Sequence, residues 1–376
     1  MITKYIKKLE TTKIKKYKLW QICDFDRKFS GVSKEKQKNI IQFKHVSAKE
    51  LKEYKLEEHG KVKLLSTGNY VGYTRYDEND KNINHGEVIT IPTGGTANIK
   101  YHKGYFVDSG NILLTSSTAN LKYIYYYLTK INEIIQGFFR GAGVQHPSMP
   151  DIIELDIPIP PMEVQNEIVE VLDKFSALEA ELEAELEARI KQYEYYRDDL
   201  LNQSNSKKMK LKEVLKIKNG KDYKKYGKGN YPVYGTGGIM THIDHYAYDK
   251  PSVLIPRKGS LDKLYYLEKP FWTVDTLFYT EINDCIAVPK FIYYYLEKER
   301  LEQYNTAGGV PSLTQTILNE IEILIPSLHE QEHIVSILDK FSTLITDIKE
   351  GLPAEIELRR KQYEYYRNKL LTFDKE

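Results

Sequence analysis

The amino-acid sequence predicts an α+β protein in which two globular α/β domains alternate with two long helices. Three observations support this prediction. The chain repeats itself, each repeat ends in a segment with helical periodicity, and the interior of each repeat mixes short apolar runs with Gly, Asn and Asp turns. The two helices are expected to pack antiparallel as a coiled coil, which would give the protein a pseudo-twofold internal repeat. With 376 residues, the chain is long enough for more than one hydrophobic core.

The repeat is strongest in two short motifs. LDKF at 172–175 returns at 338–341, an offset of 166 residues. KQYEYYR at 191–197 returns unchanged at 361–367, an offset of 170 residues. Weaker matches lie upstream and include IYYYL at 124–128 with 292–296, and VQHPSM at 144–149 with VPSL at 310–313. One physical demand therefore acts on both tails, while the domain interiors differ.

Both tails are predicted to be helices of about 40 residues, hence about 60 Å long at 1.5 Å per residue. Apolar residues recur three and four positions apart and mark one helix face. They are Ile168, Leu172, Phe175, Leu178, Leu182, Leu186, Ile190, Tyr193, Tyr196 and Leu200 in the first tail, and Ile334, Leu338, Phe341, Ile345, Ile348, Leu352, Ile356, Tyr363, Tyr366 and Leu370 in the second. A solitary helix cannot bury such a face, so the tails are expected to pack on each other. Gly351 and Pro353 are expected to kink or interrupt the second helix.

This pattern gives four segments. They are a first domain at 1–160, a first helix at 161–203, a second domain at 204–326 and a second helix at 327–376. The run LEAE-LEAE-LEAR at 178–189 consists of tetrads. One tetrad adds about 6 Å and nearly one full turn, so the helices could act as an adjustable spacer. Good helix formers on a solvated helix would explain the same composition without any such role.

Within the domains, short apolar runs indicate strands, and longer runs of helical periodicity indicate helices. The expected strands are Glu87–Pro92, Tyr105–Ser116, Ser252–Pro256, Lys263–Leu267 and Trp272–Glu281, and the expected helices are Leu121–Gly137 and Lys290–Gln303.

The formal net charge of +2 hides a segregation of charge. Residues 207–269 contain 15 Lys and Arg against 6 Asp and Glu, a balance of +9, whereas residues 163–199 contain 4 against 12, a balance of −8. A basic block in a nearly neutral chain is a candidate site for a phosphate backbone. A solvated basic surface would give the same pattern, so the segregation alone is only suggestive.

Two glycine-rich loops lie in or near the basic block, YGTGGI at 234–239 and PRKGS at 256–260, and PTGGTA at 92–97 matches the latter. Glycine lets a backbone approach a ligand, while neighbouring Arg and Lys side chains can bind phosphates or guanine, and lysines interleaved with tyrosines favour nucleic-acid binding. The candidate DNA-binding residues are Lys221, Lys224, Lys225, Tyr234, Thr236, Arg257, Lys258 and Lys263 in the second domain, and Arg75, Thr93, Thr96, Lys100 and Lys103 in the first. Tight turns between strands remain the alternative for each loop.

The repeated KQYEYYR motif crowds tyrosines onto more than one helix face, which one partner helix cannot cover. A second docking surface is therefore expected, and core packing remains the alternative. The candidate partner-binding residues are Tyr193, Tyr196 and Arg197, with their copies Tyr363, Tyr366 and Arg367.

The sequence contains no recognisable catalytic set. The nine histidines show no HExxH spacing, no GxSxG elbow is present, and Cys23 and Cys285 lack metal-ligand spacing. No site for a cofactor or a metal is expected in this chain. No apolar run is long enough to cross a membrane, and neither a membrane partner nor a signal peptide is expected. Two isolated cysteines fit a reducing cytoplasm.

These tails resemble the conserved regions of the specificity subunits of type I restriction–modification enzymes. The residues that carry the resemblance are VQNEIVEVLDKF at 164–175 with KQYEYYRDDLL at 191–201, and EQEHIVSILDKF at 330–341 with GLPAEIELRRKQYEYYRNKLL at 351–371. The second domain resembles a target-recognition domain of that family, through YPVYGTGGIM at 231–240, YDKPSVLIPRKGS at 248–260 and PFWTVDTLFYT at 270–280.

The resemblance implies a non-catalytic subunit that recognises a bipartite, asymmetric double-stranded DNA target, one half per domain, with the helices setting the gap. It also implies two methyltransferase subunits docked on the helical regions, joined by restriction subunits that are motor-nucleases. S-adenosylmethionine, ATP and magnesium would then be used by those partners. The alternatives are a coiled-coil scaffold and the DNA-recognition part of a fused restriction–methylation enzyme. The scaffold would not need basic glycine-looped domains, and the fused enzyme would need a methyltransferase motif, which this sequence lacks.

Overall fold

The structure, a computed structural model, describes residues 12–202, 206–305 and 308–373, with the side chains of 343–350 excepted. It divides into two compact units. Unit 1 comprises Met1–Glu181 and Ile356–Glu376, and unit 2 comprises Leu182–Glu355. The two long helices, α7 (Met162–Leu201) and α11 (Leu328–Leu370), each contribute one part to each unit.

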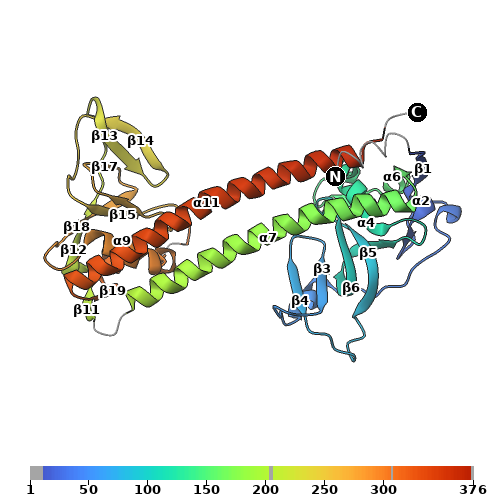
Figure 1. The fold of residues 1–376 in the computed structure, drawn as a ribbon, viewed down its shortest axis with the longest axis horizontal. Coiled ribbons are helices and arrows are strands. Elements are labelled where there is room, and N and C mark those ends of the chain that lie inside the picture. Colours follow the sequence, from blue (N-terminus) through green and yellow to red (C-terminus); the bar gives the residue numbers. More distant parts are fainter. Residues whose placement is uncertain (1–11, 203–205, 306–307, 374–376) are drawn as a thin grey trace. The chain divides into compact units, whose positions relative to one another are not determined.

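Unit 1 is built around a six-stranded sheet of order β2-β7-β5-β6-β3-β4 (Figure 1). Strands β3 and β6 are parallel, and the other neighbours are antiparallel. The strands are β2 (Asp24–Phe25), β3 (Val62–Ser66), β4 (Val71–Thr74), β5 (Asn84–Pro92), β6 (Lys100–Ser109) and β7 (Asn111–Thr115). The smaller elements are α2 (Leu19–Ile22), a 3₁₀ turn (Lys34–Lys36), α3 (Ala48–Glu53), α4 (Leu121–Lys130), α5 (Asn132–Gln136), β8 (Phe139–Arg140), β9 (His146–Pro147) and α6 (Met149–Ile152).

Unit 2 contains two small sheets, of order β12-β18-β15-β16 and β14-β13-β17. The strands are β12 (Leu215–Asn219), β13 (Lys228–Gly235), β14 (Gly238–Ile243), β15 (Ser252–Pro256), β16 (Tyr265–Leu267), β17 (Trp272–Thr273) and β18 (Leu277–Ile282). The helices are α8 (Leu211–Val214), α9 (Pro289–Lys298) and α10 (Gln315–Asn319), with a 3₁₀ turn at Leu301–Tyr304.

A two-stranded ribbon precedes each long helix. In unit 1 it pairs β1 (Lys15–Lys18) with β10 (Asp156–Ile159), and in unit 2 it pairs β11 (Lys207–Lys210) with β19 (Glu322–Ile325). A buried glutamine then fixes the start of each helix. Gln165 accepts a hydrogen bond from the backbone of Asn120 and donates one to Pro160, both at 2.8 Å. Gln331 makes the matching bonds to Val288 and Pro326, at 2.8 and 2.9 Å.

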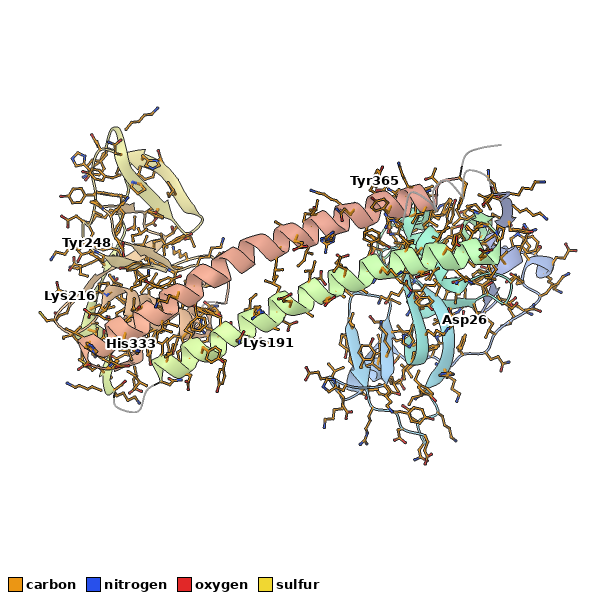
Figure 2. All side chains as sticks on the ribbon, in the orientation of Figure 1. Asp26, Lys191, Lys216, Tyr248, His333 and Tyr365 are labelled. Carbon is orange, nitrogen blue, oxygen red and sulfur yellow. The ribbon has the colours of Figure 1, made fainter. Side chains whose placement is uncertain are left out.

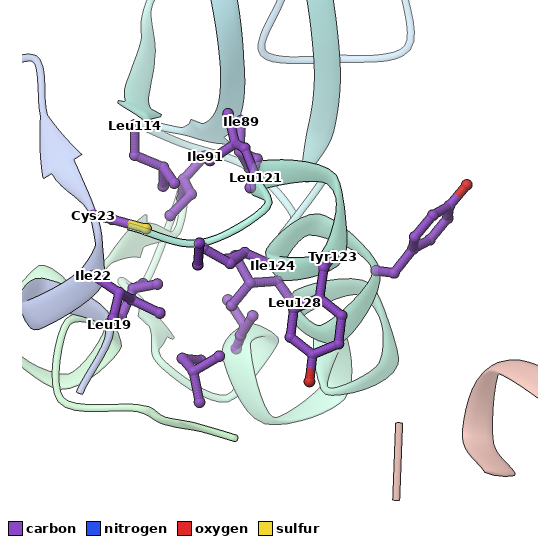
Figure 3. Close-up of a cluster of buried hydrophobic side chains, with 14 of the residues drawn as sticks. Leu19, Ile22, Cys23, Ile89, Ile91, Leu114, Leu121, Tyr123, Ile124 and Leu128 are labelled. Carbon is purple, nitrogen blue, oxygen red and sulfur yellow. The ribbon is translucent and has the colours of Figure 1, made fainter. Parts of the chain in front are cut away.

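The main core of unit 1 lies between the sheet and α4, with α2 at one side (Figure 3). Leu19, Ile89, Tyr123 and Ile124 are fully buried there, and the Tyr123 hydroxyl donates to the carbonyl of Pro158. The end of α11 completes this core through Leu370 and Leu371. The core of unit 2 is organised in the same way around α9, with Leu201 of α7 and Ile334 and Leu338 of α11.

The two long helices pack antiparallel within each unit. In unit 1, the rings of Phe175 and Tyr366 stack at 5.4 Å, and Glu179 pairs with Arg360 at 3.0 Å. In unit 2, Tyr196 stacks on Phe341 at 5.8 Å, while Leu201 joins the cluster of Ile334 and Leu338. Residue numbers therefore rise along one helix as they fall along the other, as the sequence predicted.

The expected interruption of the second helix is wrong. Helix α11 runs unbroken through Gly351 and Pro353. A proline inside a helix removes one backbone hydrogen bond but need not end the helix where packing on either side holds it. Leu338 before the proline and Leu370 after it are both fully buried.

Four of the expected helices and strands are each divided into two elements in the structure. The expected strand Tyr105–Ser116 is β6 followed by β7, because Gly110 turns the chain with a φ of 77°. The expected strand Trp272–Glu281 is likewise β17 and β18. The expected helix Leu121–Gly137 divides at Ile131 into α4 and α5, and Lys290–Gln303 divides into α9 and a 3₁₀ turn at Arg300, which has a left-handed φ of 47°.

Candidate nucleic-acid interface

Three loops of unit 2 meet along one rim. They are 235–239, 257–260 and 308–313, together called the rim of unit 2. The Thr236 hydroxyl donates to the carbonyls of Lys258 and Thr276 at 3.1 and 3.3 Å. The backbone N–H of Gly259 donates to Pro311 at 3.0 Å, and that of Leu313 donates to Arg257 at 2.9 Å. Glycine is required here, because Gly238 and Gly259 have φ values of 111° and 93°.

The candidates Arg257 and Lys258 lie on this rim, directly before Gly259 in the sequence. The Arg257 guanidinium lies 5.9 Å from the centre of the Phe278 ring, and its backbone N–H donates to Thr276. Lys258 is exposed. Thr236 is used to hold the rim together, so its hydroxyl is less available to a ligand than predicted.

Unit 1 contains a matching pair of loops, 93–97 and 141–147, called the rim of unit 1. The backbone N–H of Gly95 donates to Gln145 at 2.8 Å, as Gly259 donates to Pro311 in unit 2. The His146 ring nitrogen Nδ1 lies 2.6 Å from the carbonyl of Thr93. The Thr93 hydroxyl donates to Gly110, whereas Thr96 is exposed.

The predicted cations of unit 1 are less uniform than expected. Lys100 Nζ donates to the carbonyl of Ser66 at 2.6 Å and also to that of Gly68, and burial together with the charge of Lys63 lowers its pKa. Lys100 therefore holds a loop in place. Lys103 is exposed but lies 3.3 Å from Glu87. Arg75 is exposed.

In the segment 221–226 of unit 2, the lysines and the tyrosines have different environments. Lys221, Lys224 and Lys225 are exposed. Tyr226 packs against Trp272 at 4.8 Å and stacks on His245 at 4.4 Å, and with Tyr223 it lies against the cluster of Val233, Ile243 and Trp272. The tyrosines are therefore mainly packing groups, and the lysines remain candidate phosphate contacts. Lys263 is also exposed, while Tyr234 packs on Tyr265 at 5.6 Å.

Sequence reasoning did not single out the apolar side chains at the loop tips. Val144 and Val310 are 66% and 70% exposed at matching positions of the two rims. Ile239 on the rim of unit 2 and Met240 next to it are also exposed. The repeat of VQHPSM as VPSL contained the signal for the two valines.

Some of the predicted partner-binding residues are buried within the chain, and others are partly exposed. Tyr193 and Arg197 are only 6% and 4% exposed, and Arg197 lies 3.7 Å from Glu297 and 2.8 Å from Asp198. Tyr363 and Tyr366 are partly buried against the core of unit 1, and Arg367 is partly buried beside Tyr363. The candidate Tyr196 is 41% exposed. The motif tyrosines that protrude most are Tyr195 and Tyr365, which the candidate set left out.

A partly buried charge cluster lies near Asp26, where β2 and β6 of unit 1 end and β7 begins (Figure 2). His45 contacts Asp108 through Nδ1 and Asp26 through Nε2, both at 2.8 Å, and Arg27 lies 2.9 Å from Asp26. Hydrogen bonds to Asp108 and Asp26 raise the pKa of His45 to about 9. Burial opposes ionisation of Asp26, but hydrogen bonds from His45 and Arg27 outweigh it and lower the pKa of Asp26. Both ring nitrogens are occupied, so the cluster fastens the segment before α3 to the sheet.

Within the described parts of the chain, no group of three or more His, Cys, Asp or Glu side chains could hold a metal ion. In the same residues, no helix combines the length and the apolar character needed to cross a membrane.

Two related α/β units, each with a glycine-loop rim and each holding parts of two repeated helices, have the architecture expected of a two-domain DNA-specificity protein. The chain belongs to the family of type I restriction–modification specificity proteins. The family model described as "Type I restriction modification DNA specificity domain" matches residues 12–192 and 203–358. Specificity subunits of such systems recognise DNA and are not catalytic.

Two curated relatives match most of their own length. The Haemophilus influenzae protein named "Putative type I restriction enzyme specificity subunit S.HindORF215P" is 31% identical over 353 residues, which cover 83% of this chain and 90% of the relative. The EcoR124I/EcoR124II specificity subunit of Escherichia coli is 32% identical over 358 residues, covering 84% and 87%.

Two solved structures share the fold. The crystal structure of the S subunit of a type I restriction–modification system from M. genitalium has a TM-score of 0.58 at 20% identity, covering 97% of this chain and 98% of that one. A structure from a study of complex assembly in the type I system has a TM-score of 0.52 at 15% identity, covering 98% and 99%.

The charge cluster generates a prediction about pH. Because the pKa of His45 is raised to about 9 from an ordinary value of 6.5, its stabilising effect is complete below pH 6.5 and is lost as the pH rises through 9. Unit 1 should therefore become easier to unfold over this window, and His45→Gln should flatten the dependence. Denaturant unfolding can be followed by the fluorescence of Trp20 in a Trp272→Phe background, since each unit holds one of the two tryptophans.

His245→Gln is the matched control, because His245 lies in unit 2 and should leave the Trp20 signal unchanged. Parallel pH profiles for the parent and His45→Gln would show that the imidazolium does not stabilise unit 1.

Proposed function

We propose that each unit binds one half of a bipartite, asymmetric double-stranded DNA target through its rim. One observation carries this proposal: the two rims share a backbone hydrogen bond, Gly95 to Gln145 and Gly259 to Pro311, but carry different side chains. A common scaffold with different side chains is what two readers of different half-sites require. The recognition segments are 1–160 and 204–326, and the helical segments 161–203 and 327–376 act as the spacer between half-sites.

The chemistry of the rim of unit 2 suits a DNA groove. A guanidinium can donate two parallel hydrogen bonds to the O6 and N7 atoms of guanine. Arg257 provides such a guanidinium on this rim. Lys258 is an exposed cation for a phosphate, and Lys221, Lys224, Lys225 and Lys263 add further exposed cations to unit 2. In unit 1, the exposed candidates are Arg75, Thr96 and Lys103, although Lys103 lies near Glu87. Lys100 is bound to backbone carbonyls, and we propose the rim residues around Gln145 in its place.

The partners of this subunit are proposed to be two methyltransferase subunits and the restriction subunits of one type I system, acting on DNA in the cytoplasm. S-adenosylmethionine, ATP and magnesium would be bound by those subunits. Two copies of one partner are expected because the KQYEYYR motif occurs twice, once at the end of each long helix.

The exposed tyrosines of the motif are the proposed docking points. Tyr195 is 68% exposed and Tyr365, labelled in Figure 2, is 52% exposed. Each packs edge-on against the next tyrosine, at 5.5 Å for Tyr195 with Tyr196 and 5.2 Å for Tyr365 with Tyr366. Packing within the chain explains why Tyr193 and Arg197 recur, but it does not explain an identical protruding ring. Exposed aromatic side chains are frequent anchors of protein interfaces.

The function is tested by mapping methylation in cells that carry this chain and the methyltransferase subunit of its own system. Adenine methylation is expected at one bipartite motif, which would reveal both half-sites and the gap. Cells that carry this chain alone should show none, because the chain lacks a methyltransferase motif. Methylation by the chain alone would instead favour a fused restriction–methylation enzyme, and unspecific methylation by the pair would remove its role in specificity.

Removing Arg257 should weaken recognition of the second half-site only. We expect Arg257→Ala to lower affinity by about five- to 150-fold and to relax specificity there, since a bidentate guanine contact contributes about 1–3 kcal/mol. Lys258→Ala should weaken binding more uniformly and reduce the salt dependence. Binding is measured by titrating the complex with duplexes altered in one half-site.

Lys216→Ala is the control for charge, since Lys216 is an exposed lysine on β12 of the same unit (Figure 2). Unchanged affinity of Arg257→Ala and Lys258→Ala over the whole salt range would place both residues outside the interface.

Removal of one exposed tyrosine should prevent the binding of one methyltransferase subunit. Tyr195→Ala and Tyr365→Ala are each expected to reduce the bound methyltransferase subunits from two to one in native mass spectrometry, and the double variant should bind none. Tyr246→Ala is the control, because Tyr246 is 46% exposed in unit 2 but lies outside the motif. Two bound copies in the double variant would rule out these rings as anchors.

A further inference from the structure

The internal repeat allows one unit to serve as the comparison for the other. Helix α4 of unit 1 corresponds to α9 of unit 2. The start of α7 corresponds to the start of α11, and the end of α11 corresponds to the end of α7. Matching contacts recur between these helices: Lys122 with Asp173 and Lys290 with Asp339, Tyr126 with Asp173 and Tyr294 with Asp339, and Lys130 with Thr372 and Lys298 with Asn202.

The acidic contacts of Arg197 in unit 2, by contrast, have no counterpart among the described residues of unit 1. In unit 2, Arg197 lies between two carboxylates, 2.8 Å from Asp198 and 3.7 Å from Glu297. The Tyr193 hydroxyl also donates to Glu297, at 3.2 Å. At the matching positions in unit 1, Thr129 replaces Glu297 and Asn368 replaces Asp198. Arg367, the counterpart of Arg197, has therefore lost both of its acidic neighbours.

The consequence is a local excess of positive charge in unit 1. The Nε atom of Arg367 is buried and has no hydrogen-bond partner. Lys130 Nζ donates to the carbonyl of Leu371 and to the hydroxyl of Thr372, both at 2.8 Å, one helical turn after Arg367. Burial and the charge of Arg367 lower the pKa of Lys130. Glu364 precedes Arg367 by one helical turn but is exposed, and no ion pair joins the two in the described residues. Arg367 as a whole is only partly buried, and among the described side chains its one neighbour at hydrogen-bond range is the Tyr363 hydroxyl. A guanidinium that lacks an acidic partner and leaves one donor unused is costly, so the site favours an incoming anion.

We propose that Arg367 and Lys130 form a carboxylate-binding site, which an acidic side chain of the docked methyltransferase subunit fills. The counterpart around Arg197 is already closed by Glu297. A protein carboxylate fits better than a DNA phosphate for two reasons. The matching pocket of unit 2 uses carboxylates, and Tyr365 of the same motif protrudes two residues away. This inference rests on the proposed function, because it assigns chemistry to one of the two proposed docking points.

Two copies of one partner would then meet unlike surfaces. The copy on unit 1 forms a charge-assisted contact, and its binding weakens as salt screens that contact. The copy on unit 2 lacks this contact, so its affinity depends less on salt.

The chain itself supplies the test. Thr129→Glu transplants the carboxylate of unit 2 into unit 1, and Thr129→Gln changes size without charge. In titrations of the full chain with the methyltransferase subunit at low and high salt, one of the two binding steps of the parent should lose about tenfold affinity as salt rises. That loss should disappear in Thr129→Glu, remain in Thr129→Gln, and disappear in Arg367→Gln. The isolated Thr129→Glu chain should also resist denaturant better, because its Arg367 is paired.

Binding of two copies by the parent upholds the proposed function in the same titration. If the parent binds two copies and the salt dependence in Thr129→Glu and Arg367→Gln equals that of the parent, the carboxylate site alone is overturned. Altered DNA affinity with unchanged partner binding would identify a phosphate as the occupant and would also overturn it. Failure of the parent to bind any copy would overturn both the docking proposal and this inference.

Discussion

One aspartate in each long helix ties that helix to its own α/β unit. Asp173 pairs with Lys122 and accepts from Tyr126, and Asp339 pairs with Lys290 and accepts from Tyr294. Each carboxylate thereby joins a long helix to the helix of its α/β unit, at a boundary where apolar packing alone would allow sliding. The LDKF repeat preserves this contact. The fixed glutamines at the start of α7 and α11 complete the attachment, so the rims of each unit have a defined position relative to their own parts of the long helices.

The sequence was sufficient for the architecture because the tails are nearly periodic and nearly identical. Period and repeat fix helix, face and pairing partner, and antiparallel packing within each unit follows. Boundaries inside the domains were harder to predict, because single residues decide them. Gly110 divides one expected strand through its positive φ, and Arg300 ends an expected helix through a left-handed conformation that the residue type does not announce. Pro353 was expected to kink or interrupt the second helix, but α11 continues through it because packing on either side sustains the helix.

Candidate contacts were predictable by residue type but not by environment. Arg257 and Lys258 stand on a rim, as glycine neighbours often do. Lys100 looks the same in sequence but is tied to two carbonyl groups, and Thr236 and Thr93 use their hydroxyls to join loops. Within KQYEYYR, helical periodicity gave the faces but could not tell which face a neighbouring domain covers. That distinction required α9, whose Glu297 buries Arg197, and it left Tyr195 outside.

The discontinuity of unit 1 bears on the order in which the protein is made. Unit 2 is a single stretch of chain, Leu182–Glu355, whereas unit 1 needs Leu370 and Leu371, which are 0% and 1% exposed in its core. Synthesis runs from the N-terminus, and domains commonly fold as they emerge from the ribosome. Here the N-terminal unit emerges first but acquires its last core residues after the other unit is complete. Its core must therefore wait with an apolar surface uncovered, which is the interval when a chaperone would be most useful.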